Sequence, residues 1–178
     1  MNTKSLALAF ASLTMFATTG VAIAGSATAP LVVSATVAAS CSISTTPVSF
    51  GAYDPASAAA TTSTGSVTLS CVKNSDPSIS LTLGLHAVGS VRGMKDSVIT
   101  NTDVLSYQLY QPSSLVPNTA CTFNETTAWG ITGTELFDPA AATSIAPQTY
   151  NICGKILPGQ DVANGSYQDT VTAQVDFF

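Results

Sequence analysis

Positively charged side chains are scarce in this chain. It has 5 Lys and Arg residues against 10 Asp and Glu residues, and only 8% of its 178 residues are charged. Nucleic acids and anionic membranes are bound through clusters of Lys and Arg, so this composition argues against both as partners. Soluble monomers usually carry about a quarter charged residues. A surface with so little charge is expected of a protein that packs against copies of itself.

The residues needed for catalysis and metal binding are also rare. His86 is the single histidine, and no G-x-S-x-G, P-loop or H-E-x-x-H motif occurs. General acid–base catalysis needs His or paired carboxylates in a pocket. Four of the acids stand beside Pro, Ser or Thr, where Asp commonly stabilises turns: Asp54, Asp96, Asp103 and Asp138. The sequence therefore predicts a protein that is not an enzyme and that holds no metal or cofactor.

The first 24 residues have the pattern of a secretory signal peptide. Lys4 precedes an apolar run that closes on Ala-Ile-Ala before Gly25. The run is short, rich in Ala and Thr, and followed by no stop-transfer pattern, which argues against a membrane anchor. We therefore expect cleavage after Ala24 and export of the chain from Gly25 onward.

Four cysteines remain after this cleavage: Cys41, Cys71, Cys121 and Cys153. An exported chain meets an oxidising compartment, and no pair has C-x-x-C spacing, so two disulfides are expected. Cys41 and Cys71 lie on the apolar side of their alternating runs. Cys153 lies on the side opposite to Ile152, which places it facing outward or at a sheet edge. The favoured pairs are Cys41–Cys71 and Cys121–Cys153, each worth about 3.5 kcal/mol of chain entropy.

Short runs of alternating apolar residues dominate the rest of the chain, and helical periodicity is absent after the leader. The runs are separated by Gly, Pro, Asn, Asp and Ser, and they cover 41–50, 67–71, 79–85, 105–109, 150–156 and 171–177. Alternation means sheets with one buried face. Six or more such strands in one domain predict an all-β sandwich. The long stretch 112–147 carries Trp129, expected in the core or lining a groove, and one or two short strands.

The two ends of the exported chain share a feature, because each reads as a strand. Residues 31–40, LVVSATVAAS, carry no charge, and alternation places four apolar residues on one face: Leu31, Val33, Ala35 and Val37. The final run extends to the last residue. A sandwich that ends on such a strand lacks the strand that would follow, which leaves unpaired backbone groups and an apolar groove. The expected groove-edge residues are Tyr167, Val171, Ala173, Val175 and Phe177.

Two interpretations of the N-terminal strand remain open on these residues alone. It can be the first strand of a self-complete domain. It can also fill the groove of the next copy by β-strand addition. In the second case donor and groove are different surfaces, and such head-to-tail contacts build filaments when they do not close into a ring.

The C-terminal run GKILPGQDVANGSYQDTVTAQVDFF resembles the signature end of the spore coat protein U domain family, which includes the pilins of archaic (Csu-type) chaperone–usher pili. The pattern GQ-x-V-x-x-G-x-Y-x-D-x-V carries the resemblance here through Gly159, Gln160, Val162, Gly165, Tyr167, Asp169 and Val171. Other matching stretches are CSISTTPVSFGAYDP, GSVTLSCV, LSYQLYQ and TAWG. The second cysteine pair and Leu157 beside Pro158 depart from the family pattern.

This resemblance implies an incomplete immunoglobulin-like β-sandwich, completed by a donor strand from a neighbouring subunit. It implies a homopolymer with identical or related pilins, a periplasmic chaperone that lends a strand first, an outer-membrane usher that exchanges it, and a tip adhesin. The expected domains are a signal peptide (1–24), a donor segment (25–40) and an immunoglobulin-like domain (41–178).

The expected role is that of a shaft or minor shaft subunit of a pilus, which is secreted through the periplasm to the cell surface and supports adhesion and biofilm formation. The alternatives are a spore-coat or other surface-layer structural protein, or a monomeric adhesin-like binding module.

Overall fold

The computed structural model describes residues 20, 24–98 and 100–178, so most of the expected signal peptide lies outside the described residues. None of the described helices is long and apolar enough to cross a membrane. The chain divides into two units, 1–36 and 37–178. In the first unit, residues 24–36 form no strand, and all of their side chains are exposed.

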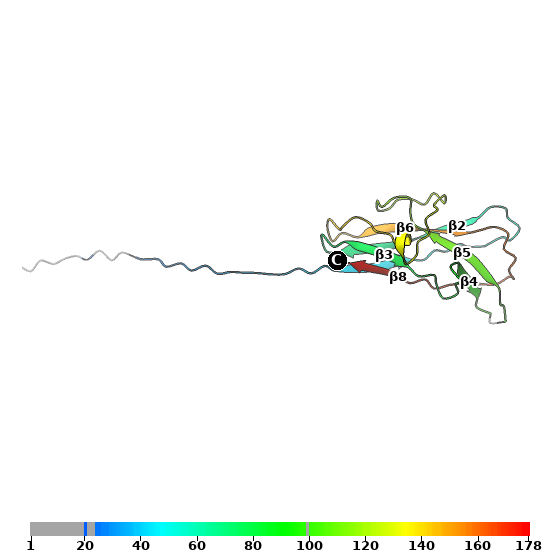
Figure 1. Cartoon of the computed structure of the whole chain (residues 1–178), viewed down its shortest axis with the longest axis horizontal. Coiled ribbons are helices and arrows are strands. Elements are labelled where there is room, and N and C mark those ends of the chain that lie inside the picture. Colours follow the sequence, from blue (N-terminus) through cyan, green and yellow to red (C-terminus); the bar gives the residue numbers. More distant parts are fainter. Residues whose placement is uncertain (1–19, 21–23, 99) are drawn as a thin grey trace, which may run out of the picture. The chain divides into compact units, whose positions relative to one another are not determined.

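The second unit is a β-sandwich of two antiparallel sheets (Figure 1). The larger sheet has the order β1-β2-β6-β5-β4-β7, and the smaller sheet pairs β3 with β8. The strands are β1 (Cys41–Thr46), β2 (Thr61–Cys71), β3 (Pro77–Leu81), β4 (Arg92–Asp96), β5 (Val104–Tyr110), β6 (Gln148–Ile156), β7 (Tyr167–Gln168) and β8 (Ala173–Phe177). A single 3-10 turn, η1 (Gly133–Glu135), is the only helical element in the described part of the chain. This confirms the predicted all-β, immunoglobulin-like sandwich.

The hydrophobic core lies between the two sheets. Alternation buries Leu105, Tyr107 and Leu109 along β5, and β6 contributes Tyr150, Ile152 and Ile156 to the same core. From the smaller sheet, Ile79 and Leu81 are 0% and 1% exposed. Full burial of a large apolar side chain stabilises the fold by about 1.5–3 kcal/mol. The predicted pattern of buried residues on β5 and β6 is therefore confirmed.

Trp129 anchors the long connection between β5 and β6 in this core. Its side chain is fully buried, and its indole N–H donates a hydrogen bond to the carbonyl oxygen of Ile79 at 3.0 Å. Its ring lies 4.9 Å from that of Phe137. Isolated antiparallel bridges pair Ala128 with Tyr110 and Phe137 with Ile79. The stretch therefore contains isolated bridges in place of the one or two short strands that were predicted, whereas Trp129 occupies the predicted core position.

Strand β4 was not predicted, because Arg92, Lys95 and Asp96 break its apolar alternation. Arg92 is nevertheless only 1% exposed. Its guanidinium donates to the carbonyl oxygens of Leu81, Thr82 and Trp129 and to the side chain of Gln108. Burial lowers the pKa of Arg92, and nearby acidic groups oppose this effect. The buried cation ties the smaller sheet to the Trp129 segment.

Both predicted disulfides form. Cys41 and Cys71 stand directly opposite each other in the β1–β2 ladder, with an S–S distance of 2.03 Å. Cys121 and Cys153 are joined with their Cα atoms 5.5 Å apart. Cys153 differs from the expectation of an outward or edge position, because it is only 1% exposed. The loop that carries Cys121 covers it, held to β6 by a hydrogen bond from the Asn151 side chain to the carbonyl oxygen of Thr119.

Two predicted strands are shorter in the structure. The expected strand from Tyr167 to Phe178 is split, because β7 pairs with β4 in the larger sheet whereas β8 pairs with β3 in the smaller one. Residues 169–172 cross between the sheets. Similarly, β3 ends at Leu81, and Leu85 is 74% exposed rather than facing the core. The chain turns at Gly84, whose φ of +89° favours glycine.

Candidate functional site: an apolar groove in the sandwich

A groove of about 1080 Å³ opens between the segment that follows β1 and the segment that leads into β8. One wall is formed by residues 45–53 with Pro55, and the other by residues 162–171 with Ala173. Between the walls, the groove is lined by core side chains: Leu81, Met94, Leu105, Tyr107, Leu109, Ile152 and Ile156. All of these residues belong to the second unit. These core side chains are buried, apart from the half-buried Met94, and they form the apolar floor of the groove.

The first wall lies directly on the backbone of the larger sheet. Strand β1 ends at Thr46, and Pro47 cannot donate a backbone hydrogen bond to continue it. Val48 and Phe50 then cross over Gly154, where an added Cβ would lie 2.6 Å from Val48 Cγ1 and 2.9 Å from Phe50 Cζ. The ring of Phe50 meets that of Tyr107 edge-on, with centroids 6.1 Å apart. The absence of a side chain on Gly154 thus allows the wall to pack closely.

The second wall is positioned by the carboxylate of Asp169. Its Oδ2 accepts a hydrogen bond from the Tyr107 hydroxyl at 2.7 Å, and its Oδ1 accepts one from the backbone N–H of Leu85 at 2.8 Å. Burial, together with this hydrogen bond to Asp169, raises the pKa of Tyr107 far above its ordinary value. The two hydrogen bonds fix the point where the chain leaves β7 and crosses toward β8.

Gln160 links strand β5 to the first wall. Its carboxamide accepts from the backbone N–H of Ser106 at 2.7 Å and donates to the Ser106 carbonyl oxygen at 2.8 Å. The β5–β6 register, continued beyond Gln108↔Lys155, would place Leu157 opposite Ser106, but β6 ends at Ile156. The side chain of Gln160 takes the place of this missing backbone pair. Its own N–H donates to the Tyr53 hydroxyl at 2.8 Å, which links it to the first wall.

Strands β1 and β8 each have one edge without a paired strand in the described part of the chain. Strand β1 pairs only with β2, and β8 pairs only with β3, among the residues that the structure describes. Contacts between β1 and β8 bring these two edges near each other. Exposed sheet edges carry unpaired N–H and C=O groups and accept an added strand. The site therefore offers both apolar pockets and backbone hydrogen-bonding groups to an extended peptide.

The electrostatics of the groove favour an uncharged occupant. Asp169 is the only lining residue that is an Asp, Glu, Lys, Arg or His. Its carboxylate already accepts the two hydrogen bonds described above. A charged side chain buried in such a groove would lose its hydration without gaining a partner, which is unfavourable.

Of the predicted groove-edge residues, Tyr167, Val171 and Ala173 line the groove. Val175 packs against the core outside the lining, and Phe177 is 37% exposed. Met94, Val162 and Tyr53 were not predicted as lining residues. The GQ-x-V pattern contains Val162 and could have indicated it, whereas Met94 lies on the unpredicted strand β4.

The predicted donor residues form no strand in the described chain. Leu31 is 86% exposed, Val33 85% and Val37 79%, and Ala35 is also exposed. Their role as a donor strand stays a prediction.

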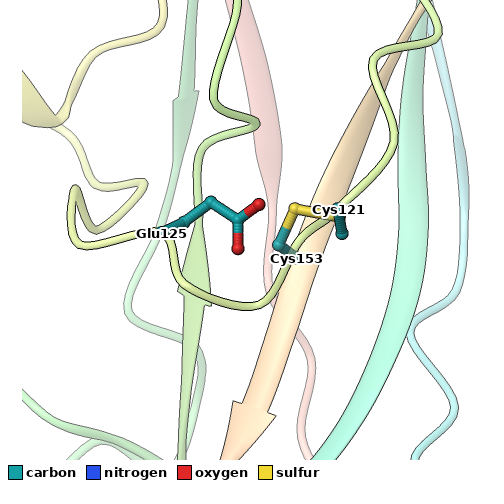
Figure 2. Close-up of side chains that lie close together, drawn as sticks. All are labelled: Cys121, Glu125 and Cys153. Carbon is teal, nitrogen blue, oxygen red and sulfur yellow. A yellow bond between two sulfur atoms is a disulfide. The ribbon is translucent and has the colours of Figure 1, made fainter.

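Glu125 lies beside the Cys121–Cys153 disulfide (Figure 2). A carboxylate oxygen lies within 4.8 Å of both sulfur atoms. Metal ions bind thiolates, whereas these two sulfur atoms are bonded to each other. In its oxidised form the cluster therefore offers one carboxylate and no thiolate, which does not make a metal centre.

Comparison with known proteins gives matches to a family profile, to a sequence relative and to a solved structure. The sequence profile of the Spore Coat Protein U domain matches residues 27–174. An alignment of 170 positions with Protein U of Myxococcus xanthus has 35% identity, and the match covers 86% of this chain and 87% of that protein.

A structural match is a chain in the crystal structure of the CsuC–CsuE chaperone–tip adhesion subunit pre-assembly complex from archaic chaperone–usher Csu pili of Acinetobacter baumannii. The TM-score is 0.51 at 28% identity, over 80% of this chain and 41% of that one. The present chain thus spans about two fifths of that chain's length. Both the profile and the relative agree with the resemblance carried by the Gly159–Val171 motif. The chain belongs to the Spore Coat Protein U domain family.

Proposed function

We propose that the protein is a structural subunit of a surface pilus, and that it polymerises by donor-strand complementation. Residues 31–37 of one copy occupy the apolar groove of the next. One observation carries the proposal: an open apolar groove beside free strand edges occurs in the same chain as an exposed, uncharged segment with strand alternation. Donor and groove lie on different surfaces, so repeated contacts extend a filament head to tail.

The chemistry of the donor segment suits the groove. Leu31, Val33, Ala35 and Val37 have no charge to desolvate, and their burial contributes about 5–10 kcal/mol of gross stabilisation. Backbone hydrogen bonds to the free strand edges add about 1 kcal/mol each. The entropy lost when the segment becomes ordered offsets part of this gain. The remainder is sufficient for a joint that resists denaturants.

The proposed route to the surface follows from the same groove. After export and removal of residues 1–24, a periplasmic chaperone fills the groove of each new subunit with a strand of its own. An outer-membrane usher then exchanges this strand for the donor segment of the next subunit, beneath a tip adhesin. The finished pilus supports adhesion and biofilm formation. The similarity to a chain from a chaperone–subunit complex supports this route.

A competing peptide tests the proposal. A synthetic peptide of residues 25–40, added while full-length subunits assemble, should occupy free grooves and shorten the polymers. The same peptide with Val33→Asp and Val37→Asp is the matched control and should leave polymer length unchanged. The proposal is wrong if the unmodified peptide neither binds the subunit nor changes polymer length.

A second candidate function is that of a spore-coat or other surface-layer protein assembled without a pilus. The 35% identity with Protein U of Myxococcus xanthus favours it. Genes for a chaperone and an usher beside the gene for this chain would favour the pilus, and their absence would favour the coat.

A further inference from the structure

The two cysteines of the Cys121–Cys153 disulfide differ in their exposure to solvent. Cys153 is 1% exposed, whereas Cys121 is only half-buried. A thiol that reduces this bond therefore reaches the Cys121 sulfur first. Glu125 lies four residues along the same loop, and its carboxylate points toward the two sulfur atoms, with an oxygen within 4.8 Å of both (Figure 2).

The two oxygens of Glu125 are held differently. Oε1 accepts hydrogen bonds from the backbone N–H of Thr122 at 2.7 Å and from its hydroxyl at 3.0 Å. Oε2 is buried and has no hydrogen-bond partner among the described residues. A buried carboxylate oxygen without a hydrogen-bond partner normally destabilises the folded state. The carboxylate that carries this oxygen lies beside the disulfide.

We propose that Glu125 protects the Cys121–Cys153 disulfide from reduction by thiols, through the charge of its carboxylate. In the reduction, an incoming thiolate attacks the Cys121 sulfur, a new S–S bond forms, and the Cys121–Cys153 bond breaks. Cys153 leaves with the electron pair as a thiolate and then takes a proton from water. A second thiol completes the reduction of the protein, and the reducing thiols are oxidised to a disulfide.

The negative charge of Glu125 opposes the first stage of this step, because it repels the thiolate that approaches Cys121. The repulsion is stronger for a thiol that carries a second negative charge and weaker for one that carries a positive charge. Free thiols are mostly protonated at neutral pH, so the equilibrium between disulfide and dithiol changes much less than the rate. The protection is therefore kinetic.

The charge state of Glu125 agrees with this role. Burial by itself would raise the pKa of its carboxyl group, but hydrogen bonds from Thr122 and from loop backbone amides outweigh that effect and hold the pKa below its ordinary value. The nearest cation on β6 is Lys155, whose ammonium group lies over the Tyr110 ring, 5.8 Å from its centroid. It forms no ion pair with Glu125 in the described part of the chain, so the carboxylate charge is not neutralised there.

The test compares wild type with Glu125→Gln, using two thiols of opposite charge. Full-length oxidised protein is treated with anionic 2-mercaptoethanesulfonate or with cationic cysteamine, and the cysteines released are alkylated and quantified by mass spectrometry. A unit charge about 4 Å away in water is worth about 1 kcal/mol, or roughly a fivefold change in rate. We expect Glu125→Gln to speed reduction by the anionic thiol at least about fivefold and to affect the cationic thiol much less.

Two controls separate charge from loosening of the loop. Asp161→Asn removes one negative charge elsewhere on the exposed surface and should leave the rate unchanged. The Cys41–Cys71 disulfide of the same molecule should react at the same rate in all variants. An equal acceleration with both thiols, or no acceleration, would overturn the proposal, because neither result depends on the charge of Glu125.

Discussion

The hydroxyl of Tyr107 donates a 2.7 Å hydrogen bond to the carboxylate of Asp169, and both residues line the groove. Tyr107 belongs to β5 in the larger sheet, whereas Asp169 begins the segment that crosses to the smaller one. This contact therefore fixes the distance between the core and the second wall. It also gives a structural reason for the Tyr-x-Asp-x-Val part of the C-terminal motif.

Removal of the Asp169 carboxylate should destabilise the subunit. Asp169→Ala loses the hydrogen bonds from Tyr107 and from the Leu85 amide, and bonds to a charged acceptor contribute about 1.5–3 kcal/mol each. We expect the free energy of unfolding to fall by about 3 kcal/mol in urea titrations, and by less for Asp169→Asn, which keeps an acceptor oxygen. Unchanged stability of Asp169→Ala would show that the crossing segment is held by other contacts.

Stability should also fall at alkaline pH because of Tyr107. Burial and the hydrogen bond to Asp169 raise its pKa in the folded state, so the native protein favours the protonated phenol. The resulting stabilisation is complete below the ordinary tyrosine pKa of about 10 and is lost as the pH rises through the native value.

Between pH 10 and the native pKa, this group lowers the unfolding free energy by up to about 1.4 kcal/mol per pH unit. Tyr107→Phe should be less stable at pH 7 but show a shallower alkaline decline in chemical denaturation. Part of the decline should remain, because burial also raises the pKa of Tyr150. Identical alkaline slopes in the two proteins would contradict the assignment to Tyr107.

The Gln160 side chain should matter far more than its surface neighbours. Gln160→Ala removes two hydrogen bonds to Ser106 and one to the Leu157 carbonyl oxygen. At about 1 kcal/mol each, the expected loss of unfolding free energy is about 2–3 kcal/mol. Gln168→Ala, on the exposed side of β7, is the matched control and should change stability by less than about 0.5 kcal/mol. Equal effects of the two substitutions would refute the role given to Gln160.

Much of this architecture follows from alternation along the chain. In β5 and β6, apolar residues recur at every second position and face a single core, so Leu105, Leu109 and Ile152 could be placed from the sequence. The cysteine pairs were also predictable, because the sides on which Cys41, Cys71 and Cys153 lie in their strands limited the possible partners. The C-terminal motif indicated the family because its spacing is specific.

Other features depend on contacts between distant segments and could not be predicted locally. Arg92 is buried only because carbonyl oxygens of the smaller sheet and of the Trp129 segment converge on it. The split between β7 and β8 depends on Asp169 reaching Tyr107, 62 positions away in the sequence. Asp169 interrupts the alternation at a single position and Val171 resumes it, so the pattern alone did not show that the chain changes sheets there.

The two faces of the donor segment should respond differently to charge. Val33→Asp places a carboxylate on the face that we propose enters the groove, and burial of an unpaired carboxylate costs several kcal/mol. Val32 is equally exposed in the described chain, at 87% against 85% for Val33, but it lies on the opposite face. We expect polymers of Val33→Asp to dissociate in mild denaturant and those of Val32→Asp to persist. The reverse order would show that the other face enters the groove.

The most direct test of the donor-strand account is the resistance of polymers to boiling in denaturing detergent, with and without residues 25–40. Assembled full-length protein should still run as a ladder of multimers after boiling in the detergent. The chain lacking residues 25–40 should still bind its chaperone, because its groove is intact, yet give only a single monomer band. A ladder of normal length from the truncated chain would contradict the account.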